Sequence, residues 1–277
     1  MGAKNFIPML WAEDVLKERD KVLIGVKHCN TDYEGEIKKM GDQVKILTVG
    51  PVISRDYTRN TEIADPDQGT SAAQYLLIDQ AKYCHIFFDD LDDAQTKKGF
   101  WEEQKRQMGI TMAGDLDTFV FSKYTDAGKQ ITNATVNTAD IFSTIAEAAE
   151  YFKTINVPEG VTKYLEVSPA IATKIVLAKI VHGTDNDKRI ETGYLGSLLG
   201  FDIYESNNIV VNGSSYECLA RTKAAISFAA QLTETEAYRP QKRFADAVKS
   251  LQVWGGKVVR PKELVRLTLT PAAESAI

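Results

Sequence analysis

The sequence lacks both the cysteine pattern and the long apolar runs that would assign it to secreted or membrane proteins. Its three cysteines, Cys29, Cys84 and Cys218, are odd in number and far apart. A disulfide framework is therefore not expected, which suits a reducing cytoplasm. No apolar run reaches the length of about 18 residues that a membrane-spanning helix needs. The start, Met1 to Phe6, has no apolar core, so a signal peptide is not expected either.

Excess positive charge is also missing. The chain holds 33 Lys and Arg against 38 Asp and Glu, a formal net charge of -5. Attraction to nucleic acid by the bulk field is therefore not expected, because phosphate binding needs clustered Lys and Arg. With 277 residues and 44% hydrophobic content, the chain can bury a substantial core in one large or two small domains.

Motifs for nucleotide binding or serine catalysis are absent from the sequence. It contains neither a G-x-x-x-x-G-K-[ST] loop nor a G-x-S-x-G elbow. Gly193, Gly196 and Gly200 resemble a phosphate-binding loop, but their spacing does not fit a dinucleotide fingerprint and no strong strand precedes Gly193. Tight turns and close helix packing are the favoured interpretation of these glycines.

The strongest metal candidates are the dipeptides His28-Cys29 and Cys84-His85. If their segments paired as strands, ligands could converge, but adjacent strand residues point to opposite faces, which leaves at most a weak site. The four aspartates between Asp89 and Asp93 lack the glycine and final Glu of an EF-hand loop, so helix capping is favoured for them. The third histidine, His182, lies in an expected loop. No metal ligand is predicted.

The N-terminal quarter of the chain holds two segments that need a packing partner. An apolar start, which contains Phe6 and Trp11, precedes a short expected helix over 13–19. It could pack on its own domain or on a neighbour's. From Thr31 to Gly69 the chain is polar and turn-rich, with β segments at 44–48 and 52–53 around Gly50-Pro51. A two-stranded hairpin is marginal alone, so this one folds back or waits for a partner.

The rest of the chain predicts a mixture of helices and strands without regular βαβ alternation, an α+β pattern. A strand is expected over Tyr75–Phe88, and a long helix from Asp93 to about Val120. Apolar residues recur near the helical period at Trp101, Met108, Met112, Leu116 and Phe119. Later helices are expected at Asp140–Phe152, with Thr138 as N-cap, and at Ala170–Ile180. Strands are expected at Tyr164–Val167, Gly200–Ser206, Val258–Val259 and Leu264–Leu269, and a short strand or turn at Phe244–Leu251.

The order of these blocks resembles the major capsid proteins of tailed bacteriophages, which have the Hong Kong 97-like capsid fold. After the polar N-terminal excursion come the long helix, then Gly193–Tyr204, then Trp254–Pro261. The resemblance covers roughly Asn5 to Thr270. It implies an N-terminal arm (1–30), an extended hairpin called the E-loop (31–72), a peripheral domain with a long spine helix (73–138 and 239–277) and an axial domain (139–238).

The same resemblance implies a structural protein: the major capsid subunit, which self-assembles into the icosahedral shell around a double-stranded DNA genome. Copies would form pentamers and hexamers, and further candidate partners are scaffolding, portal and decoration proteins. Packaged DNA would be enclosed without sequence-specific binding, and no membrane is implied. The location would be the virion, with assembly in the host cytoplasm. No catalytic residue, cofactor or metal site is predicted, so the chain is not expected to be an enzyme.

Two alternatives remain open. An encapsulin-like nanocompartment shell would share the fold, and a soluble α/β enzyme could bind a phosphorylated ligand at Gly193–Gly200. Some relatives of the resembled family form Lys–Asn crosslinks. Lys38, Lys39 and Lys45 lie in the expected E-loop, but no partner Asn is identified, so crosslinking is not predicted.

Replacing Met112 with Asp is expected to unfold the subunit. The predicted helix face buries this position, and an unpaired buried charge costs several kcal/mol. Thermal melting of the variant measures the effect, and a melting temperature equal to that of the wild type would show that the helix face is misassigned.

Overall fold

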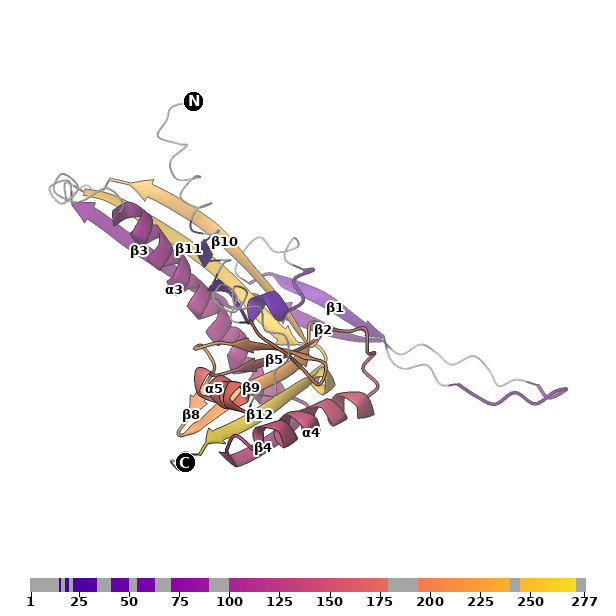
Figure 1. Ribbon diagram of the computed structural model, residues 1–277. Coiled ribbons are helices and arrows are strands. Elements are labelled where there is room, and N and C mark those ends of the chain that lie inside the picture. Colours follow the sequence, from indigo (N-terminus) through magenta and orange to yellow (C-terminus); the bar gives the residue numbers. More distant parts are fainter. Residues whose placement is uncertain are drawn as a thin grey trace.

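The computed structural model describes residues 15, 18–19, 22–33, 41–49, 54–62, 71–89, 100–178, 194–239 and 245–272. These residues form an elongated layer and a second, more compact layer beneath it, and a hairpin projects to one side (Figure 1). None of the described helices is long and apolar enough to cross a membrane.

The elongated layer is a three-stranded antiparallel sheet with a long helix against one face. Its strand order is β10-β11-β3, with β10 over Ile226–Tyr238, β11 over Ala245–Val258 and β3 over Gln80–Asp89. The helix α3 spans Phe100–Ser122. Met108, Met112 and Leu116 are buried on it as the periodicity predicts, while Phe119 is only partly buried. The start predicted at Asp93 and the Trp101 side chain lie outside the described part of the structure.

Part of the N-terminal segment packs on its own chain. Val15 is buried in a small cluster with Met108 and Met112. The segment passes so close to α3 that a Cβ added at Gly109 would lie 3.0 Å from the Val15 carbonyl oxygen and the Arg19 nitrogen. This contact explains why a long helix contains glycine at that position, despite a cost of about 1 kcal/mol relative to alanine. The apolar residues from Phe6 to Trp11 lie outside the described residues.

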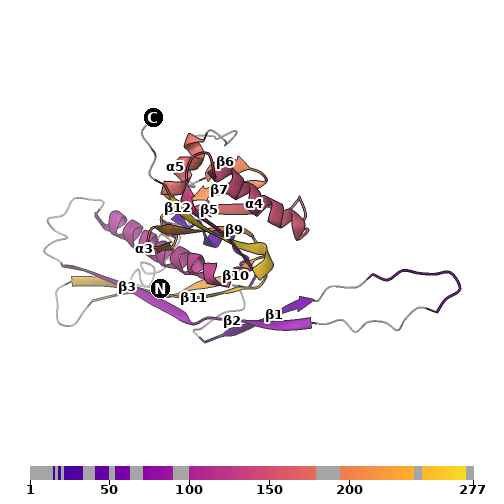
Figure 2. The same cartoon turned by 90° about the horizontal axis from the view of Figure 1, so that it is seen from below.

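The compact layer is a seven-stranded mixed sheet covered on one face by two helices (Figure 2). The helices are α4, Ile141–Thr154, and α5, Pro169–Leu177, and both contribute to the largest buried apolar cluster. The strand order is β4-β12-β9-β5-β7-β6, with β8 paired to β9. The strands are β4 (Lys129–Val136), β12 (Leu264–Pro271), β9 (Ser215–Thr222), β5 (Lys163–Val167), β7 (Phe201–Glu205), β6 (Tyr194–Leu198) and β8 (Val211–Asn212).

The starts of α4 and α5 test two sequence predictions. Ser168-Pro169 opens α5 as predicted, because proline is tolerated in the first turn. Thr138 is not the N-cap of α4, which begins at Ile141 after Asp140. Asn137 closes the preceding turn instead, with its side-chain oxygen accepting the backbone N–H groups of Ala139 and Asp140. Asparagine commonly forms such turns with its own local backbone, and it takes the role that was assigned to threonine.

The hairpin consists of β1, Gln43–Val49, paired antiparallel with β2, Ser71–Leu77. One face of it packs on the side of the three-stranded sheet that lies away from α3, where Val44, Ile46 and Leu76 join Ala229 and Val253 in a buried cluster. The opposite face exposes Leu47, Tyr75 and Leu77. Residues 54–62 lie far from the body, beyond the ends of the two strands (Figure 2).

Two strand predictions are wrong in extent. The single strand expected over Tyr75–Phe88 is divided at Ile78-Asp79, because β2 pairs with β1 whereas β3 pairs with β11. The short strand or turn expected at Phe244–Leu251 belongs to the 14-residue strand β11, which passes through Gly255 and Gly256 without a break. The β segment expected at 52–53 lies outside the described residues.

At Gly255, β11 passes very close to the end of β2. A Cβ at this position would collide with the Leu77 carbonyl. We therefore expect Gly255→Ala to lower the free energy of unfolding by about 1–3 kcal/mol, the usual cost of overpacking. Denaturant titration measures the change. Gly160→Ala is the control, because a Cβ there would have no neighbour within 4 Å; equal effects of the two substitutions would contradict the close approach.

Candidate functional site: a buried ionic clamp at the junction of the two layers

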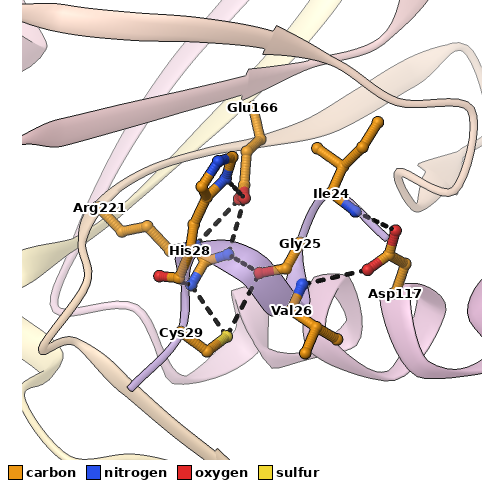
Figure 3. Close-up of polar contacts among 8 residues, drawn as sticks. All are labelled: Ile24, Gly25, Val26, His28, Cys29, Asp117, Glu166 and Arg221. Atoms are coloured by element: carbon orange, nitrogen blue, oxygen red, sulfur yellow. Dashed lines mark hydrogen bonds and ion pairs between the residues drawn. The ribbon is translucent and has the colours of Figure 1, made fainter. Parts of the chain in front are cut away.

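The segment Val22–Asn30, here called the strap, runs between α3 and the seven-stranded sheet (Figure 3). It contains a short 3-10 helix, Val26–His28. The last residue of the strap, Asn30, pairs with the free edge of β10. It exchanges two backbone hydrogen bonds of 2.9 Å with Ile226 and Phe228. The strap thus joins the N-terminal segment on α3 to the region that leads into the hairpin.

A fully buried ion pair holds the strap from the side of the seven-stranded sheet. Glu166 on β5 and Arg221 on β9 are both wholly inaccessible to solvent. Arg221 donates from Nε to Glu166 Oε2 at 2.9 Å and from Nη2 to Oε1 at 2.7 Å. The same guanidinium also donates to the carbonyl oxygens of Gly25, at 2.6 Å, and His28, at 2.9 Å. One arginine therefore binds a carboxylate and two carbonyls of the strap together.

A second buried carboxylate holds the strap from the α3 side. Asp117 accepts the backbone N–H of Ile24 at 2.9 Å on Oδ2 and that of Val26 at 3.1 Å on Oδ1. Because Asp117 lies on α3 and Glu166 on β5, the strap is bound from both layers. We call Asp117, Glu166 and Arg221 the clamp.

The side chains of the strap complete the contacts of the clamp. His28 Nδ1 lies 2.9 Å from Glu166 Oε1, and the imidazole ring stacks on Tyr164 with centroids 4.1 Å apart. The Cys29 thiol lies 3.1 Å from Arg221 Nη1. The buried charges of Glu166 and Arg221 are therefore matched by polar partners within the protein, as burial of charge requires.

The pKa values of the two buried carboxylates are shifted in opposite directions. Burial raises the pKa of Asp117 to about 6, against the lowering effect of the Ile24 and Val26 N–H groups. Burial alone would also raise the pKa of Glu166, but the Arg221 charge and the hydrogen bonds from His28 and Arg221 outweigh it and leave that pKa lowered. Asp117 therefore makes the free energy of unfolding fall as pH rises from 3.8 to about 6, while Glu166 makes it fall as pH decreases below 4.5.

The arrangement fits a structural role better than a catalytic one. Burial raises the pKa of the Cys29 thiol to about 11, so the nucleophilic thiolate is not populated near neutral pH. Glu166 is engaged on both oxygens by Arg221, with His28 on one of them. The atoms of the clamp are thus committed to one another and to the strap, and what the clamp does is fix where the strap lies.

The structure does not bring the two candidate metal pairs together. His28 lies in a 3-10 helix at the clamp, not in a strand. Cys84 and His85 lie on β3, which pairs with β11, and His85 Nε2 contacts the Tyr238 hydroxyl at 2.9 Å. Across the described ranges no group of three or more His, Cys, Asp or Glu could hold a metal ion. Of the aspartate run only Asp89 is described, and His182 lies outside the described residues.

The glycine-rich segment forms a tight hairpin between β6 and β7. Gly196 is buried within β6 with a φ of 133°, and Gly200 lies in the connecting turn with a φ of 84°. Both backbone conformations favour glycine. Gly200 agrees with the turn interpretation, whereas Gly196 lies at a register shift within β6. Glu159 and Asp202 line the adjacent cleft, and their negative charge opposes the phosphorylated ligand of the enzyme alternative. Gly193 lies outside the described residues.

Sequence reasoning missed the clamp, although a signal was present. Glu166 and Arg221 each interrupt an apolar strand, in Tyr-Leu-Glu-Val and Cys-Leu-Ala-Arg-Thr. Charged residues at inward positions of strands are expected to pair. Asp117 gave a weaker signal, a carboxylate one position after Leu116 within the buried stripe of α3.

No family model and no curated protein matches the sequence, but solved structures do. A structure from Mycobacterium phage Che8 is 28% identical, with a TM-score of 0.71 over 88% of this chain and 90% of that one. The capsid of cyanophage P-SCSP1u matches with 15% identity and a TM-score of 0.67 over 92% and 88% of the two chains. The chain thus has the fold of phage capsid proteins, and these likenesses support a tailed-phage major capsid protein.

The resemblance found in the sequence and the α+β class are both confirmed. This capsid protein also shares its fold with a virus-like particle from Pyrococcus furiosus, at 11% identity and a TM-score of 0.57 over 92% of this chain and 96% of that one. That likeness shows the fold alone, so it gives no additional support to the nanocompartment alternative.

Arg221→Met is expected to lower the free energy of unfolding by about 3–5 kcal/mol, because it leaves the Glu166 charge and two strap carbonyls buried without their donor. Chemical denaturation measures the loss. Arg260→Met is the matched control: Arg260 forms an exposed pair with Glu263 at 2.9 Å, for which a loss of at most about 1 kcal/mol is expected. If the two variants lost the same amount, the clamp would not hold the junction.

Proposed function

We propose that this capsid protein assembles through pentamers and hexamers into a closed icosahedral shell around double-stranded DNA. The observation that carries the proposal is the hairpin, which has one face anchored to the body and the other face exposed. Val44, Ile46 and Leu76 bind the base to the body, while Leu47, Tyr75 and Leu77 remain exposed on the other face. A surface of this kind on a projecting element is typical of a contact with another copy.

The domain divisions follow from the same proposal. The hairpin and its connection would be the E-loop, although β2, Ser71–Leu77, continues past the end of the assigned range 31–72, and the residues before it would be the arm. The α3 layer would be the peripheral domain, although its strand β10, Ile226–Tyr238, falls in the range 139–238 assigned to the axial domain. The sheet covered by α4 and α5 would supply most of the axial domain, although β4 and β12, which also belong to that sheet, fall in the ranges assigned to the peripheral domain. Heterologous contacts that close by rotation would generate the rings.

The stability of a closed shell comes from the repetition of the contacts between its subunits. Each contact between copies can be weak, because a closed particle repeats it many times and avidity holds the whole. A formal net charge of -5 suits a wall that must enclose a polyanion without adhering to it. Scaffolding, portal and decoration proteins would be further partners, and assembly would take place in the host cytoplasm.

Two substitutions in one strand test the proposal. Leu47→Asp places a charge on the exposed face of the hairpin, so we expect an unchanged melting temperature and loss of particles. Val44→Asp places the same charge in the buried cluster and is expected to unfold the subunit, because a buried unpaired charge costs several kcal/mol. Differential scanning calorimetry measures folding, and electron microscopy with sedimentation measures assembly. Normal particles from Leu47→Asp would refute the assigned contact.

A further inference from the structure

A further buried carboxylate lies where β9 pairs with β12. Glu217 on β9 accepts hydrogen bonds from Arg266 on both of its oxygens, from Nε at 2.7 Å and from Nη2 at 2.8 Å. The Thr268 hydroxyl donates to it at 2.8 Å, and Asn212 Nδ2 at 3.0 Å. Burial alone would raise the pKa of Glu217, but these hydrogen bonds outweigh it and leave that pKa lowered. The carboxylate is therefore negative at neutral pH and depends on its donors.

Asn212 connects this carboxylate to the segment that follows α3. Its Nδ2 also donates to the Tyr124 hydroxyl at 3.1 Å. Tyr124 lies in the 3-10 helix Lys123–Asp126, which continues α3, and its ring lies beneath the Arg266 guanidinium at 4.6 Å. Both N–H bonds of the Asn212 amide are thus bound to oxygen atoms of the protein, and they fix the direction of the side chain.

The backbone after Asn212 forms a tight turn. Asn212 pairs with Ser215, so that Gly213 and Ser214 are the two turn residues between β8 and β9. Gly213 has a φ of 63°, and glycine at this first central position is typical of a type II′ hairpin turn. Asn212 and Gly213 are exposed, and within the described ranges no hydrogen bond uses the Gly213 N–H. A side-chain amide is therefore followed by an accessible, unbonded backbone nitrogen that no side chain shields.

We propose that Asn212 is a site of spontaneous deamidation, which its hydrogen bonds to Tyr124 and Glu217 restrain. The Gly213 nitrogen attacks Asn212 Cγ and loses its proton, the bond from Cγ to Nδ2 breaks, and ammonia leaves. Water then opens the resulting succinimide ring, so the net reaction converts the amide and water into a carboxylic acid and ammonia. The attack requires one alignment of the Asn212 side chain with Gly213. The two hydrogen bonds hold the side chain against Glu217 instead, so they slow the reaction.

The product would weaken the cluster in which it forms. An aspartate at position 212 would bring a second negative charge to the place of Nδ2, which lies 3.0 Å from Glu217 Oε1. Two carboxylates this close disfavour each other's charge, and Glu217 would lose one of its donors. The link from Tyr124 to the β9–β12 pair would be lost. A virion component is not resynthesised once the particle has left its host, so a slow reaction of this kind has time to act.

The test measures deamidation at Asn212 in the folded, full-length wild type and in Tyr124→Phe, by mass spectrometry of tryptic peptides after incubation at physiological temperature and pH. Tyr124→Phe keeps the ring and removes only the hydroxyl that Asn212 binds. We expect it to react about fivefold faster, which corresponds to about 1 kcal/mol. Tyr83→Phe, at an exposed tyrosine of β3, is the matched control and should react as the wild type does. Asn207 lies on the same tryptic peptide, 190–221, and is the internal reference.

Three other measurements could overturn the inference. Equal rates at Asn212 in Tyr124→Phe and the wild type would refute the restraint, as would an equal acceleration at Asn207, because the variant would then be loosened in general. Unfolding the wild type in guanidinium chloride should accelerate the reaction further, and conversion at Asn212 no greater than at Asn207 would refute the site. Asn212→Asp reproduces the product and should lower the melting temperature; an unchanged value would refute the effect on the cluster.

Discussion

The buried pair of Glu166 and Arg221 is the interaction on which the arrangement of this protein depends. Removing two charges from water is costly, and the cost is offset only when every donor and acceptor finds a partner. Arg221 meets this condition with four oxygen acceptors, two on Glu166 and one each on Gly25 and His28, and the last two belong to the strap. Displacing the strap would therefore leave buried charge unsatisfied. This gives the path of the main chain between the two layers a single favoured geometry.

Asp117 extends this constraint to α3. An apolar contact would hold the strap to the helix without fixing its register, whereas two N–H groups bound to one carboxylate allow one position only. The strap is continuous with the N-terminal residues on α3 and leads toward the hairpin. A shell subunit needs such definition, because a small error in the direction of a projecting element grows with distance from its anchor.

Local chemistry allowed the helices and the short strands to be predicted from the sequence. The apolar period of α3 and the Ser168-Pro169 start of α5 depend on residues that are close together in the sequence. The division between β2 and β3 does not depend on adjacent residues. Tyr75–Phe88 has the pattern of one strand, and it is divided only because its two parts pair with different strands. The length of β11 was underestimated for a similar reason: Gly255 and Gly256 signal a turn in isolation, but they are required because β2 and the ring of Phe119 approach them closely.

The candidate site shows the same limit more sharply. His28 and Cys29 were weighed as metal candidates by residue type, with no metal site predicted, and both lie in a polar centre. Its other members come from positions 117, 166 and 221, and only the tertiary fold reveals that they meet there. A charged residue inside an apolar strand predicts that a polar or charged partner exists, but it does not identify the partner residue.

The place of β12 in the seven-stranded sheet has a consequence for the timing of folding. This strand lies between β4 and β9, and it pairs Val265 with Lys129 on one side and with Ala220 on the other. Until Leu264–Pro271 has been synthesised, β4 has no neighbour and β9 has one open edge. Pairings so distant in sequence form late and slowly. A nascent chain on the ribosome therefore cannot present a finished sheet before β12 is complete.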